Sequence, residues 1–537
     1  MKKFLILFLT AALALGSFSG CRSKEINNEG YEPTGNALLM EGEDPAVLEP
    51  EKEEQSLTLA YNPDKSMNPI VATDLNNRVL MSLMYQGLFA VDSRGNATPM
   101  LCSNYQVTPD NKSYTVYIDP AATFSDGTRV TAEDVMASYD AAWNSNYYRG
   151  RFLHIYKVEL VESQGGNAIR FLLDTAYQDL CPLLDFPVVK AGEVDAEVPT
   201  GSGPYAFIKT PAGAALNRVK TWWCPEAQVP ARAATINLVE VHTQSELRDQ
   251  FEFGDVSLAC TNPLSDSFAE FRCDYELWEV ESGNFLYLSC NVLYNDYFKK
   301  DDTLRKALTY AIDREKIVEE NYRGMARPTT IPASPGGPYY YESLASRYQY
   351  DALKFVDSIV GWNPPEKKNK DDKKEQKLTI LVNCDDSARL RTAHDIADAL
   401  TEFGINTGVL EYTEHTNTTV TQILRAGNFG LYLGETRLSV NNDLTPFFRV
   451  YGGLDHGGLP TDDLYTMCRE TLADKGNYYN LMQKVAEDGR VIPILFGYHA
   501  VYAKRGVFEN LQPSRDNVFY YTRGKTMSEA KLATQYE

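Results

Sequence analysis

A strand–helix–strand pattern between residues 378 and 412 constrains the fold more than any other feature of this chain. Residues 378–382 and 407–412 have the length and composition of strands. Between them, residues 388–403 place apolar side chains at helical spacing, followed by a helix-ending glycine: Leu390, Ala393, Ile396, Ala397, Leu400 and then Gly404. This order favours two parallel strands joined by a right-handed crossover. We therefore expect an α/β protein.

Other segments extend the mixed α/β pattern along the chain. Residues 57–61 read as a strand, and residues 285–288 as a buried strand. Thr131 stands three residues before Asp134, the spacing of a capping box at a helix start. Residues 303–322 carry one continuous apolar helix face, which predicts a single long helix. Residues 363–377 are charged and contain proline, so we expect a surface loop there.

The N-terminus has the pattern of an export signal. Lys2 and Lys3 precede an apolar run at residues 4–15, which is too short to cross a bilayer comfortably. The run ends in Phe18-Ser19-Gly20-Cys21, which resembles the lipobox of bacterial lipoproteins, where a cysteine thiol receives the lipid. An ordinary secretory signal with an incidental cysteine is the alternative. Residues 22–55 are rich in glutamate and poor in large apolar side chains, so we expect a disordered tether.

Charge and motif content exclude several classes of protein. The formal charge is −21, and −23 once Lys2 and Lys3 leave with the signal, which argues against nucleic acid as a partner. The histidines do not have metal-binding spacing, and neither Cys-x-x-Cys nor Gly-x-Ser-x-Gly occurs. We therefore expect no metal, no cofactor and no catalytic group. Eight cysteines besides Cys21 either form disulfides or act as small buried apolar residues; Cys260 and Cys273 are the nearest pair in sequence.

A series of motifs then points to a family. The chain resembles the family 5 extracellular solute-binding proteins, which bind dipeptides and oligopeptides, from about residue 57 to the mid-510s. The motifs that carry this resemblance occur in the family's order: Tyr85-Gln86-Gly87-Leu88, Pro99-Met100-Leu101, the diagnostic residues 124–135, Gly201-Ser202-Gly203-Pro204-Tyr205, Trp222-Trp223, residues 301–314 and Gly361-Trp362.

The resemblance implies a particular architecture. We expect a two-lobed periplasmic-binding-protein-like fold of the large peptide- and nickel-binding class (type II), with two hinge-crossing strands near residues 283–291 and 491–502. The segments that we expect are a lipoprotein signal (1–20), the lipidated Cys21 with a tether (21–55), lobe I (56–282, with an inserted subdomain at about 100–200), lobe II (283–495) and a return to lobe I (496–537). Lobe closure around a ligand would be a hinge motion.

The resemblance also suggests where ligand is held. Relatives place aromatic side chains on the crossing strands and in a segment that reaches the cleft, which here gives Phe285, Tyr287, Phe496, Tyr498 and Tyr147; core packing is the alternative for each of these side chains. Peptide-binding relatives anchor the ligand's amine with an aspartate, but the matching position here falls near Val440. Three charged side chains nearby are the polar candidates: Glu435, Arg437 and Asp443.

The expected function is capture of an oligopeptide or similar small polar solute for an ABC importer. The expected partners are the solute, the permease subunits and the membrane that holds the N-terminal lipid, with the protein a monomer outside the cytoplasm. The departure at Val440 leaves nickel complexes, opines and sugars open as ligands, because a fold does not fix its substrate. A ligand-sensing lipoprotein without transport and a secreted hydrolase are the alternatives.

Overall fold

The computed structural model describes residues 57–524, with gaps at 162–166, 212, 264–270, 366–376, 417, 450–452, 459–462 and 509. The expected signal, Cys21 and the tether lie outside the described residues, as does most of the charged loop expected at 363–377. Within the described part of the chain, no helix is both long enough and apolar enough to span a bilayer.

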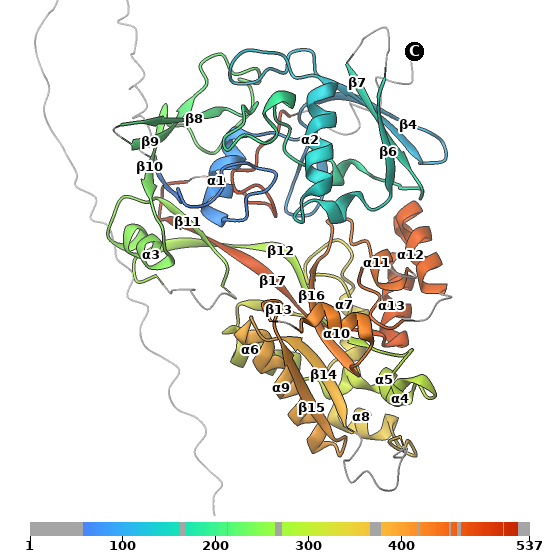
Figure 1. The fold of residues 1–537 in the computed structure, drawn as a ribbon. Coiled ribbons are helices and arrows are strands. Elements are labelled where there is room, and N and C mark those ends of the chain that lie inside the picture. Colours follow the sequence, from blue (N-terminus) through green and yellow to red (C-terminus); the bar gives the residue numbers. More distant parts are fainter. Residues whose placement is uncertain are drawn as a thin grey trace, which may run out of the picture. The chain divides into compact units, whose positions relative to one another are not determined.

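One large sheet organises the body of the protein (Figure 1). Its strands lie in the order β15-β14-β16-β12-β17-β11-β1-β10-β9-β8, and β13 pairs with β17 beside this path. The strand bounds are β1 Leu57–Tyr61, β8 Tyr205–Thr210, β9 Gly213–Arg218, β10 Thr235–Glu240, β11 Leu258–Thr261, β12 Tyr275–Cys290, β13 Ala326–Pro328, β14 Leu378–Asn383, β15 Thr407–Tyr412, β16 Leu431–Arg437 and β17 Val491–Lys504.

Strands β12 and β17 run through both halves of this sheet as an antiparallel pair, as expected for the hinge crossings. Their register is regular from Tyr275 to Glu281 and then shifts before Phe285. On one side of this irregularity the core is built from residues of β1, β10 and β11, and on the other side from residues of β14 and β16. The fold is therefore two-lobed, and both lobes share one sheet.

The first lobe adds two smaller sheets to its part of the large one. Strands β4-β5-β7-β6 form an antiparallel sheet, and β2 pairs with β3. Helix α2 packs against β6 and β7 (Figure 1) and begins at Thr131, where the predicted capping box with Asp134 is present. The bounds are β2 Phe89–Val91, β3 Ala97–Pro99, β4 Cys102–Val107, β5 Ser113–Ile118, β6 Ile155–Val161, β7 Ala168–Leu173, α1 Leu75–Met84, α2 Ala132–Asn144 and α3 Gln244–Glu252.

The second lobe contains the strand–helix–strand unit predicted from the sequence. Strands β14 and β15 are parallel, and α9 packs on both of them. The expected apolar face is buried at Ala393, Ile396, Ala397 and Leu400, whereas Leu390 is only partly buried. The helix bounds are α4 Asp296–Lys299, α5 Thr303–Ala307, α6 Arg314–Tyr322, α7 Glu342–Ala345, α8 Ala352–Ser358, α9 Ser387–Glu402, α10 Val420–Ala426, α11 Thr445–Phe448, α12 Asp463–Ala473 and α13 Tyr478–Asp488.

The single long helix expected at residues 303–322 is wrong. The segment forms α5, a 3₁₀ turn and then α6, because Ile312 is extended and the Asp313 side chain caps a new helix by accepting from the Lys316 N–H. The buried Arg314 side chain stabilises this break. Its guanidinium donates to the main-chain carbonyl oxygens of Thr309 and Ile312 that the interrupted helix leaves unpaired.

The nearest cysteine pair forms no disulfide. Cys260 lies on β11 and Cys273 precedes β12, and both are thiols in the structure. Burial raises the pKa of Cys260 to about 12. Cys260 therefore behaves as a small core residue, the second of the two roles that its sequence context left open.

Candidate functional site

The candidate site centres on Arg437, the last residue of β16 in the second lobe. Its Nη2 donates to Asp516 Oδ1 at 2.7 Å, and its guanidinium carbon lies 4.2 Å from the centre of the Tyr147 ring. Both partners belong to the first lobe: Tyr147 follows α2, and Asp516 lies in the chain that returns after β17. One side chain of the second lobe therefore contacts an acid and an aromatic ring of the first.

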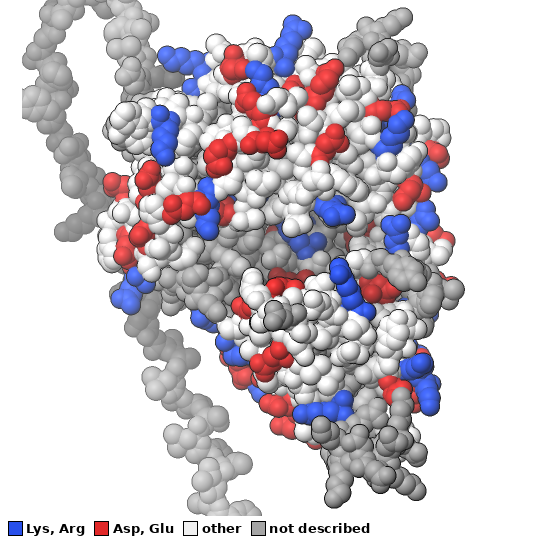
Figure 2. All heavy atoms as spheres, viewed as in Figure 1, with Lys and Arg blue, Asp and Glu red and all other residues white. Residues whose placement is uncertain are grey.

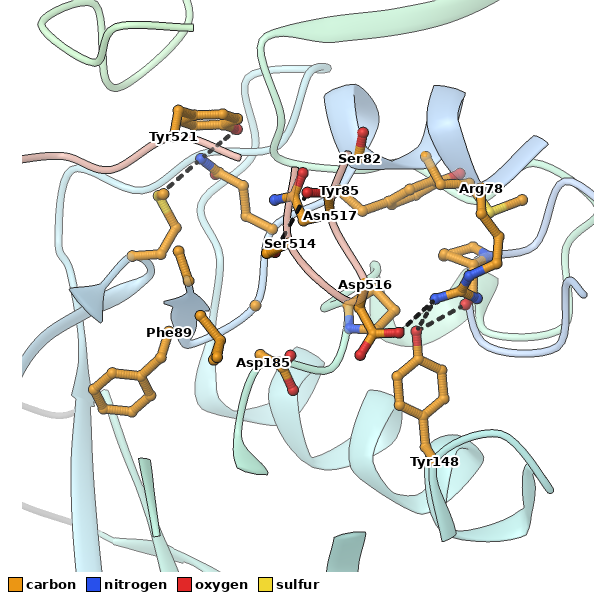
Figure 3. A pocket seen from close by; sticks show the side chains of 18 residues that line it. Arg78, Ser82, Tyr85, Phe89, Tyr148, Asp185, Ser514, Asp516, Asn517 and Tyr521 are labelled. Atoms are coloured by element: carbon orange, nitrogen blue, oxygen red, sulfur yellow. Dashed lines mark hydrogen bonds and ion pairs between the residues drawn. The ribbon is translucent and has the colours of Figure 1, made fainter. Parts of the chain in front are cut away.

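Asp516 collects basic and hydroxyl partners from several distant segments. Arg151 donates to Asp516 Oδ2 at 2.5 Å, the Tyr147 hydroxyl donates to Oδ1, and Arg78 Nη2 of α1 lies 3.8 Å away. In Figure 3, Asp516 and the Tyr148 hydroxyl both lie at the Arg78 guanidinium, and Asp185 borders the same pocket. Arg151 also forms an ion pair with Asp185. The site is therefore a network of arginines and aspartates that are far apart in the sequence and meet only in the folded chain.

Burial and neighbouring charges define the protonation of this network. Burial acts to raise the pKa of Asp516, but the guanidinium groups of Arg437, Arg151 and Arg78 outweigh it and hold that pKa well below its usual range. Burial raises the pKa of Asp185 above its usual value, against the effect of Arg151. Burial also raises the pKa of Tyr147 to about 12, so its hydroxyl is neutral.

A cavity of about 190 Å³ adjoins this network, lined from both lobes by residues that include Tyr147, Arg151, Arg437, Val440 and Asp516. A second cavity, of about 300 Å³, shares Leu438, Ser439, Val440 and Arg515 with it and continues along the Gly-rich turn 334–339. A third, of about 70 Å³, lies within the first lobe and is the pocket of Figure 3.

In Figure 2 the surface is hollowed between the upper and lower parts, and basic side chains are visible in the recess.

Two of the candidate residues from the sequence meet at this cavity, namely Tyr147 and Arg437. Three other aromatic candidates lie inside the core of the second lobe, where the Phe285 ring packs on Tyr287 (ring centres 5.6 Å apart) and on Phe496 (4.9 Å). Phe496 also borders the 300 Å³ cavity. Tyr498 is buried on β17 opposite Glu281, and burial raises its pKa to about 12.

The two acidic candidates already hold protein partners and are not among the residues that line these three cavities. Glu435 forms an ion pair with Arg389 inside the second lobe, and burial raises its pKa. Asp443 lies 3.3 Å from Nε2 of His154 in the first lobe and accepts the Thr445 N–H at 2.8 Å.

His154 makes a second link between the lobes. Its Nδ1 lies 2.8 Å from Asp174, so the imidazole stands between one carboxylate of each lobe. Burial acts to lower the His154 pKa, but the hydrogen bonds and charges of Asp443 and Asp174 outweigh it and raise that pKa. The same contact lowers the pKa of Asp443 against the effect of burial.

Sequence reasoning missed Arg78, Arg151, Asp185, Arg515 and Asp516. These residues come from four separate segments, and no periodic pattern marks them. The one available signal was local: Arg515 and Asp516 are adjacent charges in a short polar segment, and Arg151 closely follows Tyr147.

The architecture and the cavity define a class of protein: a two-lobed α/β protein with a charged cavity between its lobes, joined by two strands of a shared sheet. The family model for bacterial extracellular solute-binding proteins, family 5 (middle region), matches residues 96–457. The chain belongs to this family, whose members are substrate-binding proteins.

Individual relatives agree with this assignment. The glutathione-binding protein GsiB of Shigella flexneri is 24% identical over 308 residues, which are 54% of this chain and 58% of that protein. The chain thus matches less than two thirds of the length of that relative. The substrate-binding protein CtaP of Listeria monocytogenes has a TM-score of 0.66 at 18% identity, with 88% of this chain and 99% of that chain covered.

The oligopeptide-binding protein AppA of Bacillus subtilis, solved with a nonapeptide, has a TM-score of 0.59 at 20% identity, with 88% and 99% covered. At these identities the likeness to the two solved structures shows the fold.

Proposed function

We propose that this chain is the extracytoplasmic substrate-binding protein of an ABC importer, which captures an oligopeptide or similar small polar solute between its lobes and delivers it to a membrane permease. The observation that carries the proposal is the contact of Arg437 from the second lobe with Tyr147 and Asp516 from the first, at the edge of the 190 Å³ cavity.

This geometry suits a protein whose ligand closes it. A solute shifts the balance between open and closed forms only if it binds one form more tightly than the other. A molecule in the cavity contacts residues of both lobes at once, so it binds the closed form better. A permease that recognises the closed form would then distinguish loaded from empty protein.

The segment boundaries follow from the same proposal. Residues 56–282 and 496–537 would form one lobe, with an inserted subdomain at about 100–200, and residues 283–495 the other. A cleaved signal at 1–20 and a lipid on Cys21 would leave residues 21–55 as a tether on the outer side of the cell membrane. Two acyl chains on Cys21 are sufficient for stable anchoring. The protein would act as a monomer and without catalysis.

Native mass spectrometry of freshly purified protein tests the proposal, together with thermal-shift screening of peptides, opines and metal chelates. We expect a small polar solute to co-purify or to raise the melting temperature. Arg437→Gln should weaken that binding. Arg469→Gln is the matched control, because Arg469 of α12 also reaches the first lobe, at Thr175 Oγ1 (2.9 Å), but does not line the cavities described above.

Two results would contradict the proposal. If no solute binds in any screen and none co-purifies, the chain does not capture a solute. If incubation with peptide or glycan mixtures yields product, the chain is an enzyme. Uptake of the identified solute by cells with and without the gene separates an importer from a sensor, because only an importer changes the rate of uptake.

A further inference from the structure

Two arginines, one from each lobe, are held side by side on a single carbonyl oxygen of the hinge strand. The main-chain oxygen of Ser282 accepts from Arg437 Nε at 2.9 Å and from Arg515 Nε at 3.1 Å. Arg515 also donates to the Leu438 carbonyl oxygen. Both arginines are among the residues that line the 190 Å³ cavity. Two like charges in such proximity repel one another unless an anion lies between or beside them.

Within the part of the chain that the structure describes, Arg515 forms no ion pair with a carboxylate. Its side chain instead donates to the main-chain carbonyl oxygens of Ser282 and Leu438. Glu281 is close enough to act on Arg515 electrostatically, yet these two described residues form no ion pair. A guanidinium carries more N–H donors than the two carbonyl bonds use. Arg515 therefore retains donors for a ligand.

The wider network does not supply the missing negative charge. Four guanidinium groups, those of Arg78, Arg151, Arg437 and Arg515, are accompanied by three carboxylates, those of Asp185, Asp516 and the partly exposed Glu281. The oxygens of Asp516 already accept from Arg437, Arg151 and Tyr147, and Asp185 is paired with Arg151. Burial of charge without a counter-charge is costly, and the four arginines exceed the three acids, so an additional anion would stabilise the arrangement.

We propose that Arg437 and Arg515 together bind a carboxylate group of the solute, so that the imported molecule is an organic acid or a peptide with a free carboxyl end. This inference rests on the proposed function and specifies the chemistry of its substrate. The two guanidinium groups offer convergent charge-assisted donors, which match the oxygens of a carboxylate. The adjoining 300 Å³ cavity gives the remainder of the solute a place to extend.

Matched pairs of solutes test the proposal on the purified full chain. Each pair is a short peptide or small organic acid with a free carboxylate, and the same molecule as its carboxamide. We expect the acid member to bind more tightly in calorimetry, on the order of 10- to 100-fold, and its affinity to fall with added salt. Equal binding of both members overturns the proposal but leaves the proposed function standing.

Other ligands and variants distinguish the remaining outcomes. If a neutral or cationic solute binds and no acid does, the carboxylate assignment is overturned but the proposed function stands. The same holds if inorganic phosphate binds as tightly as any acid. If no solute of any kind binds, the proposed function fails as well. Arg515→Gln should remove the acid-over-amide preference, whereas Arg469→Gln should keep it. Retention of the full preference by Arg515→Gln, with its folding confirmed by circular dichroism, refutes the role of Arg515.

Discussion

Replacement of Gly283 by alanine should destabilise this protein much more than the same change at another glycine with similar backbone angles. Gly283 lies on β12 where the register with β17 shifts, and its φ is +78°. A side chain in this left-handed region costs about 1–2 kcal/mol. A methyl group at this position would also overlap the Arg515 guanidinium, so that side chain would have to leave its place.

The second cost follows from the hydrogen bonds of Arg515. Its bonds to the carbonyl oxygens of Ser282 and Leu438 have a charged donor, and loss of one such bond costs about 1.5–3 kcal/mol. With the backbone cost added, we expect Gly283→Ala to lower the free energy of unfolding by about 2.5–5 kcal/mol. Gly404, which follows α9, is the control because its φ is +84°. A methyl group added there would have no described atom within 4 Å beyond its own chain neighbours. Gly404→Ala should therefore cost only the backbone term, about 1–2 kcal/mol.

Equilibrium urea unfolding, followed by tryptophan fluorescence and by circular dichroism, measures both variants. Two further proteins, Arg515→Ala and the double variant Arg515→Ala/Gly283→Ala, test whether the displaced guanidinium causes the difference in unfolding free energy between Gly283→Ala and Gly404→Ala. With the long side chain gone, Gly283→Ala should cost about as much as Gly404→Ala. Equal costs of Gly283→Ala in both backgrounds would refute the steric argument, and so would equal losses from Gly283→Ala and Gly404→Ala in the unmodified background.

Three further predictions concern other parts of the protein. The folded-state pKa of His154 is raised, so its stabilising contribution is fully present below its unfolded pKa of about 6.5 and is lost as pH rises through the raised value. The variant His154→Gln should therefore lower the melting temperature more at low pH than at high pH. An equal loss at all pH values would contradict this. Burial raises the pKa of both Cys260 and Cys290 to about 12, so neither thiol should react with iodoacetamide in the native protein at about pH 8, whereas both should react in urea, as peptide mass spectrometry can check. Thr131→Ala removes the capping box with Asp134 and should lower the free energy of unfolding by about 1 kcal/mol, and an unchanged urea midpoint would contradict this.

Local sequence patterns predicted those parts of the fold that depend on local interactions. The unit from β14 to β15 was predictable because its strand and helix periods are uninterrupted, and the start of α2 because its cap needs only Thr131 and Asp134. The break before α6 was not. It depends on the buried Arg314, which donates to the Pro493 carbonyl oxygen at 2.7 Å, and that residue is 179 positions away.

The candidate site was predictable only in part, for a similar reason. Arg437 and Tyr147 were identified through the family resemblance, and the structure brings them together. Arg515 was not identified, because its importance arises from the Ser282 oxygen that it shares with Arg437. That contact joins segments more than 200 residues apart, and no spacing rule links them.

The shift in register between Glu281 and Phe285 has a mechanical consequence. A ladder of backbone hydrogen bonds resists torsion wherever it is continuous, and it yields most easily where it is interrupted. Rotation of one lobe against the other should therefore concentrate in these few peptide units. The carbonyl group of Ser282 lies in this flexible segment and orients the guanidinium groups of Arg437 and Arg515. Each opening of the lobes would therefore also separate these two side chains and release a ligand bound between them.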